Sequence, residues 1–134
     1  MSQKISKGIK DLLSDANEVV TTVSIEKCKS LQKNKNFVFV DLRDYREILK
    51  DGKIPGAFSC PRGMLEFWID PDSPYHKEFF NQDKTYIFYC ASAWRSALAT
   101  KAAMEMGLSP VVHLEGGFNE WLKQGGATET IHKK

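Results

Sequence analysis

The sequence lacks the features that mark several large classes of protein. No apolar run approaches the roughly 20 residues that a membrane-spanning helix needs. Residues 1–8 have no apolar core of the kind found in a secretory signal. The net charge is only +2 and no basic run stands out, which argues against nucleic-acid binding. We therefore expect neither a membrane nor a nucleic acid among the partners of this protein.

Cysteine is also scarce. The 134 residues include only Cys28, Cys60 and Cys90, with no C-x-x-C pair and no cysteine–histidine cluster of zinc-site spacing. An odd number of irregularly spaced cysteines argues against a disulfide framework and for a reducing compartment. We expect a cytoplasmic protein with no metal and no cofactor. Cys28 and Cys60 are interpreted as small core residues, although Cys60 could instead be a resolving thiol for Cys90.

What is present is the composition of an ordinary globular domain, with 42% hydrophobic and 27% charged residues. Strand-like runs alternate with helical patterns, which predicts an α/β fold. Residues 37–40 form a continuous apolar run, typical of a strand buried on both faces of a parallel sheet. We predict one domain with a central, mainly parallel five-stranded sheet and helices on both faces. The expected strands lie near residues 20–22, 37–41, 57–59, 86–90 and 111–114, and the expected helices near 7–17, 24–33, 44–52, 62–69, 75–80 and 115–125, with a longer one ending at 106.

One stretch suggests chemistry. A buried strand over residues 86–90 leads through a short loop into the helix that ends at Met106, with Gly107 as its stop. Cys90 therefore lies where a helix begins, near unpaired N–H groups and the positive end of the helix dipole. This environment favours the nucleophilic thiolate over the thiol, and Arg95 adds a fixed positive charge. The loop is a candidate anion cradle with a sulfur nucleophile at its base.

The loop also carries a family resemblance. Cys90-Ala-Ser-Ala-Trp-Arg95-Ser96 resembles the C-x-x-G-x-R-S active-site loop of rhodanese-type sulfurtransferases. Three further segments resemble family motifs in family order: Asp41-Leu-Arg43, Lys53-Ile-Pro-Gly-Ala57 and Leu114-Glu-Gly-Gly-Phe-Asn-Glu-Trp121. Ala93 stands where the family has glycine, and a positive φ there would cost alanine about 1 kcal/mol. The resemblance predicts a rhodanese-like domain over residues 24–125, preceded by a packed helix and edge strand in 1–23 and followed by a flexible tail, 126–134.

The resemblance implies a double displacement. The Cys90 thiolate takes the outer sulfur of a small anionic donor such as thiosulfate, and the resulting persulfide passes it to cyanide, sulfite or a thiol. Backbone N–H groups of the loop would stabilise the negative charge. The implied site is Cys90 with the loop residues Ala91, Ser92, Ala93, Trp94, Arg95 and Ser96.

Several roles within that site stay open. Arg95 either binds the donor or braces the loop, and Ser96 is favoured as a helix cap over a hydrogen-bond donor to the persulfide. Trp94, if exposed, would form a rim that contacts a protein or an apolar donor. Asp41 and Arg43 are expected first to tie a strand end to a helix start. Arg62 could face the substrate.

Three other functions compete with a small-molecule sulfurtransferase. A sulfur carrier that takes persulfide from a protein donor would need the same Cys90. Cysteine phosphatases and arsenate reductases use a similar loop with five residues between cysteine and arginine, whereas only four separate Cys90 from Arg95. A shorter loop suits a sulfur atom better than a tetrahedral phosphate. Non-catalytic rhodanese-like modules commonly lack the cysteine, which is present in this chain.

Overall fold

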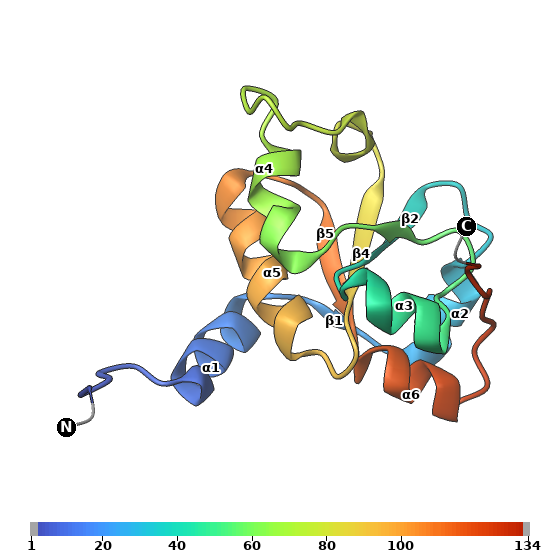
Figure 1. Cartoon of the computed structure of the whole chain (residues 1–134), viewed down its shortest axis with the longest axis horizontal. Coiled ribbons are helices and arrows are strands. Elements are labelled where there is room, and N and C mark those ends of the chain that lie inside the picture. The colour runs from blue at the N-terminus through green and yellow to red at the C-terminus, as the bar shows by residue number, and fades with distance from the viewer. Residues whose placement is uncertain (1–2, 133–134) are drawn as a thin grey trace.

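Five parallel strands form the central sheet of the computed structural model, which describes residues 3–132 (Figure 1). The strand order is β1-β5-β4-β2-β3, and every pairing is parallel. The bounds are β1 Thr22–Val23, β2 Phe37–Asp41, β3 Phe58–Ser59, β4 Thr85–Tyr89 and β5 Val111–Leu114. The carboxyl ends of all five strands therefore meet at one edge, where α/β proteins place their ligand sites. The predicted α/β fold is confirmed.

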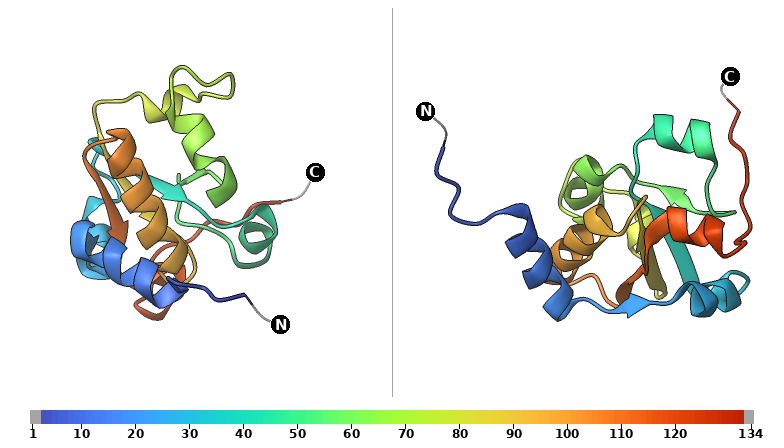
Figure 2. Two further views of the ribbon diagram at one scale, coloured as in Figure 1. Left: turned by 90° about the vertical axis from the view of Figure 1, so that its left-hand side faces the viewer. Right: turned by 90° about the horizontal axis from the view of Figure 1, so that it is seen from below.

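Helices cover both faces of this sheet (Figures 1 and 2). One face packs against α4 and α5, and the other packs against α2 and α6. The N-terminal helix α1 lies on α5, where Leu13 and Ala16 contact Ala97. The helices are α1 Ile9–Val19, α2 Ile25–Leu31, α3 Tyr45–Asp51, α4 Leu65–Ile69, α5 Trp94–Met106 and α6 Gly117–Lys123, with 3₁₀ turns at Arg62–Met64 and Glu78–Phe80.

The central strand β4 explains why its sequence is apolar without alternation. Tyr86 and Phe88 belong to the core under α4 and α5, whereas Ile87 and Tyr89 belong to the core under α2 and α6. All four are fully buried. A strand covered on both faces has no solvent side, so it carries no polar alternation.

Two predicted elements differ from the structure. The edge strand lies at Thr22–Val23 rather than 20–22, because the Val20 N–H still bonds to the Ala16 carbonyl as the C-cap of α1. The helix expected over 75–80 is reduced to one 3₁₀ turn at Glu78–Phe80. Its first residues instead fold back, with the Lys77 N–H donating to the Trp68 carbonyl at 3.0 Å. Proline at 71 and 74 keeps the preceding chain out of helical geometry.

The segment expected to be a flexible tail begins with residues that bond to the domain. The backbones of Lys53 and Glu129 exchange two hydrogen bonds, and the indole of Trp121 donates to the Ala127 carbonyl at 2.8 Å. Lys53 replaces the histidine of the family motif, and its Nζ lies 2.6 Å from the Ala57 carbonyl and 3.0 Å from Glu129 Oε1. Residues 133–134 of the expected tail, like residues 1–2 of the N-terminal segment, lie outside the described part.

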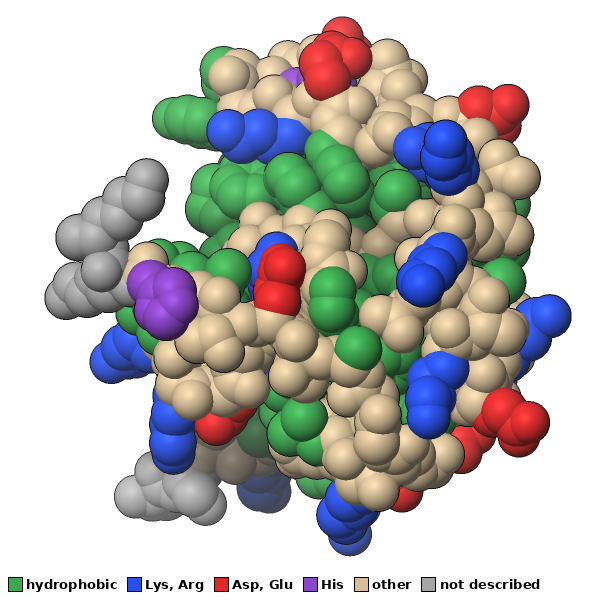
Figure 3. Space-filling model, turned by 90° about the vertical axis from the view of Figure 1, so that its right-hand side faces the viewer, with side chains coloured by type: hydrophobic (Ala, Val, Ile, Leu, Met, Phe, Trp, Pro, Cys, Tyr) green, Lys and Arg blue, Asp and Glu red, His purple; other side chains and the backbone are tan. Residues whose placement is uncertain are grey.

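The surface mixes both signs of charge. On the face shown in Figure 3, Lys, Arg, Asp and Glu side chains surround a patch of hydrophobic ones in the upper half. Within residues 3–132, no helix has both the length and the apolar composition to cross a membrane.

Candidate active site

Cys90 directly follows β4 at the carboxyl edge of the sheet, and four residues later the chain is in helix α5. The backbone N–H of Ser96, in the first turn of α5, donates to Cys90 Sγ at 3.3 Å. Cys90 is only 1% exposed, so access to its sulfur is narrow. The predicted loop thus contains a helix N–H aimed at the sulfur, and the structure assigns that contact to Ser96.

The loop turns through Ala93. This residue has φ 73° and ψ 0°, and among residues 3–132 it is the one non-glycine residue with positive φ. The left-handed conformation explains why the family motif has glycine at this position, since a Cβ is disfavoured there. Its neighbours in sequence, Ser92 and Trp94, are both exposed, and the exposed fraction of Trp94 is 58%. Trp94 is therefore exposed, which is what the sequence analysis required for a rim that contacts a protein or an apolar donor.

The start of α6 supports the loop from behind. The N–H of Phe118 donates to the Cys90 carbonyl at 2.8 Å, and that of Asn119 donates to the Ala91 carbonyl at 3.0 Å. Gly117, with φ 68°, makes this approach possible, because a Cβ on it would lie 2.6 Å from the Ala91 oxygen. The second glycine of the Leu114–Trp121 motif is therefore required for close backbone packing. The carbonyls of Cys90 and Ala91 are held by α6.

Arg95 connects the loop to α3. Its guanidinium makes two parallel hydrogen bonds to Glu47, at 2.8 and 3.0 Å. The same carboxylate accepts from the Asp44 N–H and completes the capping box of α3. The hydrogen bonds between the two groups lower the pKa of Glu47 and raise the pKa of Arg95. These contacts tie the loop to α3 and favour the bracing role, one of the two left open by the sequence.

Asp41 and Arg43 form a buried pair beside the loop. Arg43 Nε and Nη2 lie 3.0 and 2.7 Å from the two Asp41 oxygens, and Nη2 also donates to the Gly52 carbonyl at 2.7 Å. The guanidinium stacks 4.2 Å from the centroid of the Phe118 ring. Both side chains are fully buried, and the bonds from Arg43 Nε and Nη2 with the stacking on Phe118 tie the end of β2 to α3 and α6. This is the structural role expected first from the sequence.

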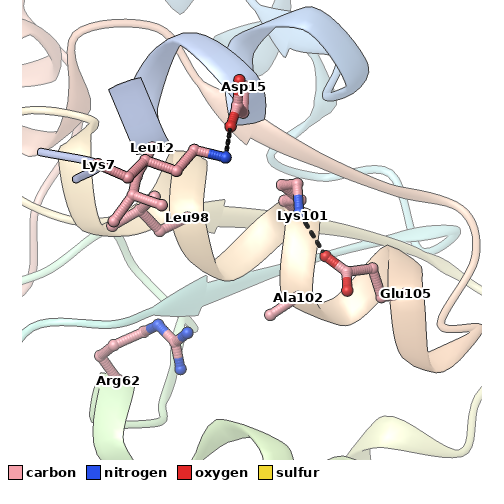
Figure 4. Close-up of a pocket in the computed structure, with 8 residues that line it drawn as sticks. All are labelled: Lys7, Leu12, Asp15, Arg62, Leu98, Lys101, Ala102 and Glu105. Atoms are coloured by element: carbon pink, nitrogen blue, oxygen red, sulfur yellow. Dashed lines mark hydrogen bonds and ion pairs between the residues drawn. The ribbon is translucent and has the colours of Figure 1, made fainter. Parts of the chain in front are cut away.

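Arg62 is not brought to the Cys90 loop by any contact seen among the described residues. Its Nη1 donates to Glu66 Oε1 at 2.8 Å. The side chain instead lines a groove beside α1 and α5, together with Leu12, Leu98 and Lys101 (Figure 4). A role for Arg62 next to the reacting sulfur has no support from this position.

The two other cysteines lie in the core. Cys28 belongs to the cluster under α2 and α6, and Cys60 to the cluster under α4 and α5. Both are 0% exposed, and burial raises the pKa of each thiol to about 12. A thiol with so high a pKa is a poor nucleophile at neutral pH. The structure therefore favours the core interpretation of Cys60 over the resolving-thiol alternative.

The predicted cap at Ser96 is wrong. Ser96 is the third residue of α5, and its hydroxyl lies 2.9 Å from His113 Nδ1 on β5. His113 Nε2 in turn lies 3.0 Å from Thr22 Oγ1 on β1. His113 is 2% exposed, and burial lowers its pKa to about 4, so the imidazole is neutral. His113 was not predicted as part of the site, although a histidine inside the apolar run Val111–Leu114 is a usable signal.

Comparison with known proteins decides the family. The model of the rhodanese-like domain matches residues 24–124. The chain belongs to the rhodanese-like family. Mouse thiosulfate sulfurtransferase/rhodanese-like domain-containing protein 3 is 30% identical over 105 residues, covering 75% of this chain and 67% of the mouse protein. A Mycobacterium tuberculosis protein named as a probable adenylyltransferase/sulfurtransferase, MoeZ, is 46% identical over 94 residues, covering 70% of this chain and 22% of MoeZ.

One solved structure is similar to this rhodanese-like chain over nearly its whole length. It comes from Rhodopseudomonas palustris and is described as a protein of unknown function and possible tyrosine phosphatase. The two chains are 54% identical, with a TM-score of 0.94 and coverage of 96% of this chain and 99% of the other. The similarity extends beyond the family domain into the terminal segments. The names of the relatives thus support transferase chemistry, with phosphatase chemistry as the alternative to be tested.

Proposed function

We propose that this protein is a sulfurtransferase that moves sulfane sulfur through a persulfide on Cys90. The Cys90 thiolate attacks the outer sulfur of thiosulfate, the S–S bond of the donor breaks, and sulfite leaves with the electron pair. Cyanide or a thiolate then attacks the outer sulfur of the persulfide, which releases thiocyanate or a new persulfide and restores the Cys90 thiolate. No net oxidation occurs, because the sulfur atom arrives and leaves at the same oxidation level.

The observation that carries this proposal is the Ser96 N–H at 3.3 Å from Cys90 Sγ, at the start of the 13-residue helix α5. A preorganised N–H at a helix N-terminus stabilises negative charge on the sulfur. The narrow access to Cys90 suits a donor whose reacting atom is a slim terminal sulfur. Membership of the rhodanese-like family agrees with this chemistry.

We also propose which donors and acceptors the site uses. A small anionic donor such as thiosulfate and a thiol or cyanide acceptor need only reach the sulfur. A protein persulfide donor would in addition contact the exposed Trp94, since exposed aromatic side chains next to a site are typical contact anchors. The similarity to MoeZ, a much longer protein named as a probable adenylyltransferase/sulfurtransferase, is one reason to test such a relay. Three free thiols suit a reducing compartment, and we propose the cytoplasm.

Phosphatase chemistry is the second candidate, because of the description given to the Rhodopseudomonas palustris protein. A cysteine phosphatase needs its loop arginine free to bind two phosphate oxygens. Here Arg95 is engaged by both oxygens of Glu47, and only four residues separate it from Cys90. Both features favour sulfur transfer over phosphoryl transfer.

The test offers the purified protein thiosulfate, 3-mercaptopyruvate and a cysteine-desulfurase persulfide in turn, and measures cyanide-dependent release of thiocyanate. We expect turnover with at least one donor and complete loss in Cys90→Ser. Cys28→Ser and Cys60→Ser should retain turnover and lose only thermal stability. If Cys60→Ser is as inactive as Cys90→Ser while still folded by circular dichroism, the role given to Cys60 is wrong. The absence of turnover with every donor would contradict the sulfurtransferase proposal.

A further inference from the structure

We infer that His113 is a positioning residue for the active site, which holds the first turn of α5 so that the Ser96 N–H stays aimed at Cys90 Sγ. The inference rests on the proposed function and adds to it a residue outside the loop and outside the family motifs. His113 does not contact the sulfur. It acts through Ser96, which contacts His113 with its side chain and Cys90 with its backbone.

The geometry places His113 at the junction of three elements. On β5 it is paired in register with Thr22 of β1 on one side and with Phe88 of β4 on the other. Its Nδ1 lies 2.9 Å from Ser96 Oγ on α5, and its Nε2 lies 3.0 Å from Thr22 Oγ1. Both ring nitrogens are therefore occupied. The ring forms a cross-link between the edge strand of the sheet and the helix that carries the sulfur's hydrogen-bond donor.

The chemistry of the cross-link favours one fixed geometry. A neutral imidazole has one N–H donor and one acceptor nitrogen, and each hydroxyl can supply the complementary group. The chain Thr22–His113–Ser96 is satisfied at both ring nitrogens in either tautomer. Ser96 and His113 are both buried, so a broken bond between them is costly, because a polar group left unpaired in the interior loses its water without replacement. The Ser96 side chain is thus held in one place, and its N–H is held with it.

A polar residue at this point of β5 has no simple packing reason. The other positions of β5 are Val111, Val112 and Leu114, and a fourth aliphatic side chain on this strand, facing an alanine at position 96, would fill the buried site without any polar group to satisfy. His113 bonds to Ser96, and the backbone N–H of Ser96 contacts the sulfur of Cys90. Both observations point to a function at Cys90 rather than to stability alone.

The experiment separates the two ends of the imidazole. In His113→Asn the amide takes the place of Nδ1 and can still bond to Ser96, whereas in His113→Gln the amide takes the place of Nε2 and can reach only Thr22. With thiosulfate and cyanide, we expect kcat of His113→Gln to fall on the order of tenfold, while its KM for thiosulfate stays within about twofold of wild type. We expect kcat of His113→Asn to stay within about threefold of wild type. Alkylation of Cys90 by iodoacetamide at one fixed pH should fall in the same order.

A purely structural role predicts a different result. Both variants would then lose thermal stability, and both would keep wild-type kcat and alkylation rates at temperatures where they are folded. That outcome, or equal losses in the Asn and Gln variants, would overturn the inference. If His113→Gln does not fold, Ser96→Ala removes the same bond and keeps the backbone N–H, so an alkylation rate within about twofold of wild type in Ser96→Ala would overturn it too.

The two proposals fail separately. If wild-type protein transfers no sulfur, the proposed function is wrong, and the alkylation rates still decide the role of His113 because they need only the Cys90 sulfur. If wild-type protein transfers sulfur and the His113→Gln rates match it, the proposed function stands and the inference about His113 is wrong.

Discussion

Ala93 shows how one residue can carry strain at the site. Its φ of 73° lies in the left-handed region, which glycine adopts freely and alanine does not. We expect Ala93→Gly to raise the free energy of unfolding by up to about 1 kcal/mol, since relief of the strain outweighs the added chain entropy of glycine. Urea denaturation measures this change. A loss of stability in Ala93→Gly would show that the methyl group makes contacts worth more than the strain.

From the sequence, Cys90 was identified as the candidate nucleophile and placed correctly between β4 and α5, but the contacts of its neighbours were not predicted. Cys90 was identifiable because a strand-to-helix junction is local in sequence, and the electrostatics of a helix start follow from that junction alone. The Ser96–His113 contact joins residues 17 apart and the Arg95–Glu47 contact joins residues 48 apart. A side chain's choice between a local cap and a distant partner depends on tertiary packing, so the cap predicted for Ser96 was wrong.

Between elements, the contact of α6 with the loop depends on Gly117. Gly117→Ala adds a Cβ that would lie 2.6 Å from the Ala91 oxygen, in addition to the cost of its positive φ. Gly125→Ala is the matched control, because Gly125 has φ 73° and no heavy atom within 4 Å of the added Cβ. We expect Gly125→Ala to cost about 1 kcal/mol and Gly117→Ala about 2 kcal/mol more. Denaturation curves measure both costs, and equal costs would contradict the close packing of α6 on the loop.

The link between α3 and α5 makes a second prediction. If Arg95 acts as a brace, Arg95→Ala and Glu47→Ala lower kcat to a similar extent, and the double variant is no worse than either one. Arg95→Lys should not restore the rate, because an ammonium group cannot reproduce the two parallel bonds to Glu47. Steady-state kinetics with thiosulfate provide the measurement. A rise in KM for thiosulfate that is specific to Arg95→Ala would show instead that Arg95 binds the donor.

Elements with a strong local pattern were predicted well. The run at 37–41 and the strand at 111–114 match β2 and β5, and Gly107 ends α5 in the left-handed conformation expected of a helix stop. The failures occurred where local patterns are weak. Residues 75–80 contain apolar side chains at helical spacing, but the segment is fixed by bonds to Trp68 rather than by its own helix.

For the molecule as a whole, the buried His113 predicts a dependence of stability on pH. Its pKa is about 4 in the folded protein against 6.5 ordinarily, and burial is the cause. The unfolded chain binds the proton more readily than the folded protein. The contribution of neutral His113 to the free energy of unfolding is therefore fully present above pH 6.5 and declines as the pH falls toward about 4. Between pH 6.5 and about pH 5 the free energy of unfolding should fall by about 1.5 kcal/mol.

The range between pH 6.5 and about pH 5 distinguishes the effect of His113 on stability from the effects of the carboxylates. The pKa values of Glu47 and Glu129 are lowered by Arg95 and Lys53, so their contributions persist above the ordinary value of 4.5 and disappear only as the pH falls below it. Urea denaturation of wild type and His113→Asn at pH 6.5 and about pH 5 tests the assignment, since the two proteins differ only at position 113. An equal loss of stability in the two proteins would contradict it.

Intact-mass measurement after thiosulfate treatment shows whether Cys90 carries sulfur. We predict that the protein becomes one sulfur atom heavier, that the added atom is on Cys90, and that cyanide removes it. The same preparation should show negligible hydrolysis of p-nitrophenyl phosphate, because Arg95 is held by Glu47. Hydrolysis of this phosphate that depends on Cys90, together with no added sulfur from any donor, would contradict sulfur transfer by Cys90 and favour a phosphatase.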